Sequence, residues 1–178
     1  MSSLEVEFRE ARRGDGPALL ELKRQLDRET RFMLLEAGER TERAEDVVVA
    51  IQRVQASPNS ALIVADTASG LVGYVEATGG TYRRNHATAY IVIGVLEGAS
   101  GRGVGRGLLA AVERWAVAHG MHRLELTVMA DNRRAIRLYE RAGFLKEGRR
   151  RECLIVDGEL IDELYMAKLL TSASAKED

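Results

Sequence analysis

The chain has 178 residues, 46% of them hydrophobic, which is enough for one domain with a full core and too little for two. Its 26 basic and 27 acidic residues give a formal net charge of −1, so no overall charge attracts nucleic acid or an anionic membrane. A small-molecule or peptide partner fits this composition better.

Export, membrane insertion and metal binding are all unexpected. The first five residues lack a basic stretch followed by an apolar run, and no segment contains the roughly 18 consecutive apolar residues of a membrane span. Cys153 is the only cysteine, which excludes an intramolecular disulfide, and the three histidines show no metal-ligand spacing. We therefore expect a cytoplasmic protein without a metal.

The first half of the chain predicts two helices between strands. Alternating apolar and charged residues predict a half-buried strand at the start, and Asp15 and Pro17 mark the cap and first turn of a helix. Leu19, Leu22 and Leu26 share one face of that helix. The expected elements are a strand at residues 4–9, helices at about 15–30 and 43–55, and a hairpin of strands at 61–65 and 71–77.

The second half alternates strands with helices and ends in a hairpin. The nearly all-apolar run from Ala87 to Val95 predicts a central strand covered on both faces, and Gly94 inside it indicates a bulge or a close backbone approach. The expected elements are strands at 87–95 and 124–128, helices at about 104–119 and 132–142, strands at about 144–156 and 159–169, and a disordered tail at 171–178. This order predicts a mixed α+β domain over residues 1–170.

A glycine-rich loop joins the apolar strand to the helix that follows it. Gly101, Gly103, Gly105 and Gly107 stand at alternate positions where that helix begins. Glycines let the backbone approach a ligand closely, and the free amides and positive dipole of a new helix favour phosphate oxygens. Two arginines between these glycines add positive charge. The loop therefore predicts a phosphate site rather than a simple turn.

Two common phosphate sites are excluded by the spacing of this loop. A P-loop needs Gly-Lys-Ser/Thr, but Arg106 and Gly107 follow Gly105. The dinucleotide fingerprint G-x-G-x-x-G also fails, because its third glycine would fall at Arg106 or Leu108.

Two motifs resemble those of the GNAT acetyltransferases. Val95 and residues 101–106 are similar to the family's acetyl-CoA signature, V-x-x-x-x-[Q/R]-x-x-G-x-G, with Ser100 where that pattern has Gln or Arg. Residues 132–144 are similar to the family's N-x-x-A-x-x-L-Y-x-x-x-G-F block. The resemblance is strongest from the predicted hairpin onward and weaker before it.

The resemblance implies a mostly antiparallel sheet of about seven strands, splayed at its middle and flanked by four helices. It implies an N-acetyltransferase that passes the acetyl group of acetyl-CoA to a primary amine, and it allows a homodimer. The residues that it implies in acetyl-CoA binding are Ile93, Gly94, Val95, Gly101, Arg102, Gly103, Val104, Gly105, Arg106 and Asn132.

The resemblance also implies catalytic roles. Tyr139 matches the family's tyrosine that protonates the leaving thiolate, and it lies about two helical turns after the first residue of its block. The general base is open, because ribosomal-protein alanine N-acetyltransferases carry a Glu where this chain has Thr127. Glu76 and Glu36, with Glu39 beside the latter, are the alternatives.

The acceptor is predicted from residues 31–40, which border the amine side of the cleft in this family. Glu36 and Glu39 offer partners for an ammonium group, and Arg31 and Arg40 offer partners for a carboxylate. This mixture favours a free amino acid or a similar small amine, ahead of polyamines and protein N-termini. A domain of this fold that binds an acyl-CoA without catalysis, as a sensor, is the remaining alternative.

Overall fold

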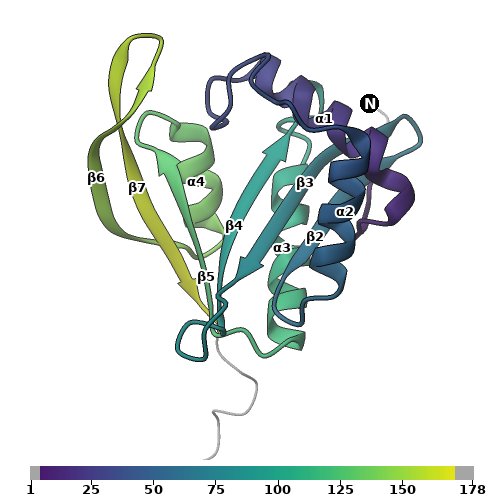
Figure 1. Ribbon diagram of the computed structural model, residues 1–178. Coiled ribbons are helices and arrows are strands. Elements are labelled where there is room, and N and C mark those ends of the chain that lie inside the picture. Colours follow the sequence, from purple (N-terminus) through teal and green to yellow (C-terminus); the bar gives the residue numbers. More distant parts are fainter. Residues whose placement is uncertain (1–4, 171–178) are drawn as a thin grey trace, which may run out of the picture.

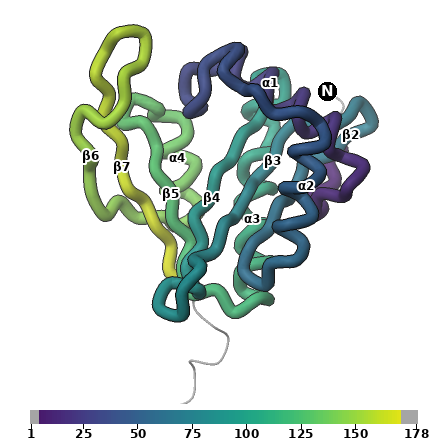
Figure 2. Tube along the Cα trace, viewed as in Figure 1, coloured from purple at the N-terminus to yellow at the C-terminus, as the bar shows by residue number. Residues whose placement is uncertain are grey.

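A seven-stranded sheet runs through the protein, with two helices on each face (Figures 1 and 2). The computed structural model describes residues 5–170, so Leu4 and the tail expected at 171–178 lie outside it. In chain order the elements are β1 Glu7–Glu10, a 3₁₀ turn Arg13–Asp15, α1 Gly16–Glu29, α2 Ala44–Gln55, β2 Ala61–Thr67, β3 Gly70–Gly79, β4 Thr88–Val95, a 3₁₀ turn Glu97–Ala99, α3 Val104–Ala118, β5 Arg123–Met129, α4 Arg133–Arg141, β6 Leu145–Val156 and β7 Glu159–Leu169. The expected α+β class is confirmed.

The sheet splits at its middle, between β4 and β5. Its strand order is β1-β2-β3-β4-β5-β7-β6, and every neighbouring pair is antiparallel except β4 with β5. These two strands pair only over Thr88–Tyr90 and Arg123–Glu125, and beyond Tyr90 they separate (Figure 1). The splayed, mostly antiparallel sheet expected from the sequence is therefore confirmed.

Apolar side chains form a separate core on each face of the sheet. On one face, α1 and α2 bury Leu19, Leu22 and Leu26, as the predicted helix face requires. On the other face, α3 and α4 pack Leu108 and Ile136 into a second core with the strands. Because α1 and α2 lie over β2 and β3, no helix within residues 5–170 covers that face of β5, β7 and β6 (Figure 1).

A buried ion pair holds the loop between α1 and α2, residues 30–43. Asp27 on α1 is the one buried charged residue within residues 5–170, and it accepts hydrogen bonds from Arg40 Nε at 2.6 Å and Nη2 at 3.0 Å. These bonds and a further one to Glu42 raise the pKa of the Arg40 guanidinium. Removing one partner of a buried pair costs about 3–5 kcal/mol, so this contact fixes the loop against α1.

Two expectations for the N-terminal segment need correction. The first strand was expected at residues 4–9, but β1 begins at Glu7 and ends at Glu10. Asp15 precedes α1 without capping it, because its carboxylate is occupied elsewhere. Its oxygens accept a hydrogen bond from the Arg12 N–H at 2.6 Å and two from Arg9 at 2.8 and 2.9 Å.

The expectations for β4 are also partly wrong. Its Ala89 and Ile91 are buried against the α3 side, but Tyr90 and Val92 on the opposite face are each 39% exposed, because α1 and α2 do not extend over them. Gly94 forms no bulge, since β3 and β4 pair without a shift in register. A Cβ at Gly94 would lie 2.6 Å from Leu26 Cδ1, so helix packing explains this glycine.

Within the described part of the chain, no helix combines the length and apolar character needed to cross a membrane.

Gly107 in α3 tests how closely the helix lies on the sheet. A Cβ at this position would overlap the Phe8 ring of β1. We expect Gly107→Ala to lower the free energy of unfolding by about 1–3 kcal/mol, the usual cost of overpacking, although alanine favours helix formation. Thermal unfolding measures the change. Gly98→Ala is the control, because nothing lies within 4 Å of its Cβ; equal melting temperatures for the two variants would contradict the expected packing.

Candidate active site

β4 has a free backbone edge where it parts from β5. It pairs with β3 along its length, but pairing with β5 ends at Tyr90. Backbone groups of Ile93, Gly94 and Val95 that point away from β3 therefore face the gap. An unpaired strand edge is a template to which an extended molecule can add. The edge of β4 at these three residues is therefore open to an extended ligand.

The glycine loop ends at the N-terminus of α3 with unpaired amides. Gly101 has φ +79° and Gly103 has φ +88°, a left-handed conformation that side chains disfavour. Gly103 is the N-cap of α3 and has no side chain to cap the helix, so no capping side chain among the described residues accepts a hydrogen bond from the first turn, which includes Val104. Such amides and the positive helix end favour an anion.

Unpaired arginines surround this loop. Arg102 and Arg106 form no ion pair or side-chain hydrogen bond within residues 5–170, in agreement with a phosphate-binding role. The sequence reasoning missed Arg134, which reaches the loop from α4: its Nη2 would lie 3.5 Å from a Cβ at Gly101. The sequence feature that could have identified Arg134 is its position two residues after Asn132, because a side chain in the first turn of a helix points back towards the preceding loop.

Gly105 differs from the other loop glycines in having an apolar side chain of α4 close to the position of its missing Cβ. Its N–H lies in the first turn of α3, but a Cβ there would lie 2.9 Å from Leu138 Cδ2 of α4. The missing side chain at Gly105 therefore allows α3 and α4 to pack closely. This separates it from Gly103, whose Cβ would have no atom closer than Arg106 Nη2 at 3.9 Å.

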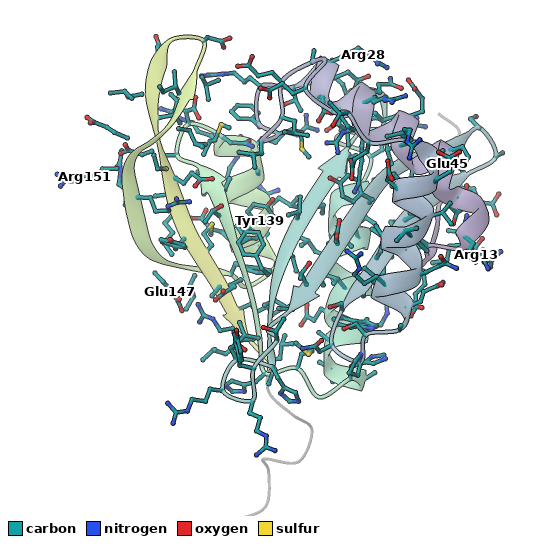
Figure 3. All side chains as sticks on the ribbon, viewed as in Figure 1. Arg13, Arg28, Glu45, Tyr139, Glu147 and Arg151 are labelled. Carbon is teal, nitrogen blue, oxygen red and sulfur yellow. The ribbon has the colours of Figure 1, made fainter. Side chains whose placement is uncertain are left out.

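Tyr139 lies at the gap between β4 and β5, on the buried side of α4 (Figure 3). Its ring packs on Phe144 with centroids 5.9 Å apart, and its hydroxyl makes no hydrogen bond to the described residues. Burial, and to a lesser extent the neighbouring Tyr90, raises the pKa of Tyr139 above its usual value. The phenol therefore stays protonated at neutral pH and can donate a proton. Asn132 caps the same helix, its Oδ1 accepting from Ala135 N at 3.1 Å.

The two predicted carboxylates are not brought together with Tyr139. Glu76 on β3 is partly buried and lies 3.5 Å from Lys23 Nζ of α1. Glu36 is exposed in the α1–α2 loop, where its N–H donates to Glu39 Oε2 at 2.8 Å. Glu76 stands opposite Val92 of β4 in the β3–β4 register, but within residues 5–170 no hydrogen bond joins either carboxylate to Tyr90 or Tyr139.

The two predicted carboxylate-binding arginines differ in availability. Arg40 is occupied by Asp27, so the expectation that it binds a substrate carboxylate is wrong. Arg31 lies at the surface, where it pairs with Asp131 at 2.8 Å and Asp157 at 3.6 Å. It joins the α1–α2 loop to the loop before α4 and to the β6–β7 turn, across the wide end of the gap.

No cluster of three His, Cys, Asp or Glu side chains suited to a metal ion occurs in residues 5–170.

Comparison with solved structures shows a close match in fold. The chain is 27% identical to an acetyltransferase of GNAT family from Streptococcus pneumoniae, with a TM-score of 0.90 over 94% of this chain and 100% of that one. A GNAT superfamily phosphinothricin acetyltransferase from Sinorhizobium meliloti, in complex with AcCoA, is 18% identical, with a TM-score of 0.83 over 97% of this chain and 92% of that one.

Sequence comparisons identify the family to which the chain belongs. An L-amino acid N-acetyltransferase of Escherichia coli is 43% identical over 47 residues, which is 26% of this chain and 29% of that protein. The matches cover only 17% and 29% of the length of two curated relatives. The sequence model of the Acetyltransferase (GNAT) family matches residues 19–144, more than half of the chain. The protein therefore belongs to the GNAT acetyltransferases.

Proposed function

We propose that this acetyltransferase passes the acetyl group of acetyl-CoA to the primary amine of a small amino-acid-like molecule. The observation that carries the choice of acceptor is the mixed charge around the uncovered face of the sheet. Arg31 has exposed ion pairs with Asp131 and Asp157, and such pairs are worth only about 0–1 kcal/mol, so a substrate carboxylate can replace them. The carboxylate of Glu76, which stands opposite the partly exposed Val92 of β4 in the β3–β4 register, suits the ammonium group.

The glycine loop and β4 form the donor side of the proposed site. The amides of the loop and of the first turn of α3, together with Arg102, Arg106 and Arg134, suit the pyrophosphate of coenzyme A. The free edge of β4 at residues 93–95 suits the pantetheine arm, with Asn132 on the other side of the gap. The AcCoA complex of a structural neighbour supports this donor.

Tyr139 is the proposed general acid. Acetyl transfer releases a thiolate, and the buried, protonated phenol at the gap can supply its proton. Glu76 and Glu36 are the bases proposed from the sequence. Packing against Phe144 alone would also account for the Tyr139 ring, so the two roles need a direct test.

The other acceptors fit less well. β6 carries a run of arginines, 149–151, of which Arg149 and Arg150 pair with carboxylates of β7. A polyamine would meet these positive charges beside the uncovered face. A protein N-terminus receives no added support, since Thr127 stands where ribosomal-protein alanine N-acetyltransferases carry a Glu.

Gly103→Val tests the donor site. We expect it to reduce acetyl-CoA affinity at least tenfold in a folded domain, because the side chain obstructs the approach of a phosphate to the loop amides. Gly120→Val is the matched control: Gly120 has φ +68° with free space around it, but lies at the other end of α3. Both variants share a backbone cost of about 1–2 kcal/mol. Equal affinities by calorimetry would refute the site.

Tyr139→Phe tests the general acid. We expect kcat to fall roughly 10²-fold with acetyl-CoA affinity unchanged, since only the proton is lost. Because the pKa of Tyr139 is raised, the wild-type rate should show no loss of this acid below about pH 10. Tyr82→Phe, at an exposed tyrosine, is the control. Full activity of Tyr139→Phe would assign the tyrosine to packing.

A panel of acceptors tests the substrate. We expect kcat/KM for L-amino acids to exceed that for spermidine and for an alanine-terminated peptide. Arg31→Gln should raise KM about tenfold for an amino acid, but not for the amine that lacks only its carboxylate, because the lost contact is with that group. Arg28→Gln, at another exposed ion pair, is the control. A preference for spermidine or the peptide would overturn this substrate.

A further inference from the structure

A row of polar side chains crosses the uncovered face of the sheet. Tyr90, Thr127, Glu163 and Arg150 come from β4, β5, β7 and β6, which are neighbours in that order. Arg150 and Glu163 stand directly opposite each other in the β6–β7 register, and Thr127 stands opposite the residue two positions after Glu163 in β7. Such diagonal neighbours are within reach of a long side chain, so the register itself assembles the row.

Hydrogen bonds connect these four side chains into one network. Tyr90 Oη lies 2.7 Å from Thr127 Oγ1, which lies 3.0 Å from Glu163 Oε1. The other carboxylate oxygen, Oε2, pairs with Arg150 Nη1 at 2.7 Å and accepts from Cys153 Sγ at 3.6 Å. The Glu163 side chain is only 12% exposed, so this end of the hydrogen-bond network is shielded from solvent.

The Glu163 carboxylate sets the direction of every hydrogen bond in this network. A carboxylate only accepts, so Thr127 Oγ1 must donate to Glu163, and Thr127 has no second proton for Tyr90. Tyr90 therefore donates to Thr127. The Thr127 N–H also donates to the Tyr90 oxygen, at 3.3 Å. The exposed Tyr90 then presents an acceptor lone pair, rather than a proton, to the solvent-filled side.

The exposed end of this hydrogen-bond network, at Tyr90, lies beside Tyr139, the proposed general acid. Tyr90 is the last residue of β4 that pairs with β5, so it stands at the point where the gap opens. Tyr139 approaches the same gap from α4 (Figure 3). The two phenols are close enough that charge on Tyr90 disfavours charge on Tyr139. An amine that attacks a thioester here would meet Tyr139 on one side and the Tyr90 oxygen on the other.

We infer that Glu163 is the terminal proton acceptor of the reaction, reached through Tyr90 and Thr127. As the amine nitrogen bonds to the acetyl carbon and the C–S bond breaks, an N–H proton passes to Tyr90 Oη. The Tyr90 proton moves to Thr127 Oγ1, and the Thr127 proton moves to Glu163 Oε1. The coenzyme A thiolate takes its proton from Tyr139. Tyr90 touches the substrate, whereas Glu163 acts through its neighbours.

Glu163 fits this role better than the two carboxylates proposed from sequence. Glu76 faces Lys23 on the α1 side, and Glu36 is exposed in a loop, and neither joins a hydrogen-bonded path to the gap. The titratable or charged groups beside the Glu163 path are Arg150 and Cys153 from β6, Tyr165 from β7, Glu125 from β5, Tyr90 from β4, and Tyr139 from α4 beyond Tyr90.

A pH profile distinguishes a proton path from a structural bridge. We expect Glu163→Gln to lower kcat/KM for the amine about 10²-fold near pH 7, the scale of a lost general base. The deficit should shrink as the pH rises, because hydroxide then takes the N–H proton in place of Glu163. Affinity for acetyl-CoA should not change. A bridge that only holds β4 against β5 would give a deficit independent of pH.

Two further variants locate the path. Thr127→Val keeps the shape of the side chain but removes the hydroxyl, so it should show the same pH-dependent loss of kcat/KM as Glu163→Gln. Thr127→Ser keeps the hydroxyl and should have the wild-type pH profile. The double variant Thr127→Val with Glu163→Gln should lose no more than either single change, because both interrupt one path. Glu147→Gln is the matched control: Glu147 is an exposed carboxylate on β6 that pairs with Arg123 of β5, and its loss should leave the pH profile unchanged.

The inference rests on amine acetylation but not on the choice of amine, so the assay uses whichever acceptor the wild type prefers. A preference for a polyamine would overturn the proposed substrate alone. Unchanged kinetics of folded Glu163→Gln, a pH-independent deficit, or the same profile in Glu76→Gln or Glu36→Gln instead would overturn the proton path. Failure of the wild type to acetylate any amine would overturn both.

Discussion

The separation of β4 from β5 after Tyr90 is the constraint on which the rest of the structure depends. Two strands that part leave backbone groups unpaired, and such groups are costly unless another polar partner meets them. Contacts on both faces of the sheet lie where the gap begins. On one face, α4 packs Ile136 and Tyr139 into the core. On the other, the Tyr90–Thr127 hydrogen bond joins the strands just beyond their last paired residues.

Charge is distributed so that, among the described residues, several arginines are paired with carboxylates while those of the glycine loop are not. The guanidinium groups of Arg9, Arg40 and Arg123 are held by carboxylates, whose hydrogen bonds raise each arginine pKa. Arg102 and Arg106 at the glycine loop form no such pairs within the described residues. A chain with a formal net charge of −1 can thus present a local positive site to a phosphate without attracting polyanions in general.

Features set by local sequence were predictable, and those set by strand register were not. Helix faces follow from a period of 3.6, and the loop glycines follow from their spacing before a helix, so the sheet, the helices and the donor loop were expected. The packing roles of Gly94 and Gly105 were not predicted, because the side chains that exclude a Cβ, Leu26 and Leu138, lie far away in sequence. Glu163 was missed for the same reason, since only the β5–β7 register brings it beside Thr127.

Two tyrosines at one gap can serve opposite purposes because their surroundings differ. Tyr139 is enclosed by the core, which disfavours its ionised form and keeps a proton available for a leaving group. Tyr90 is partly exposed, and its own proton is already directed towards Thr127 and Glu163. In the proton path inferred here, Tyr90 gains one proton as it gives up another and stays neutral throughout. Negative charge on Tyr90 would hold the proton of Tyr139 more tightly, so a path that keeps Tyr90 neutral also leaves the acid free to act.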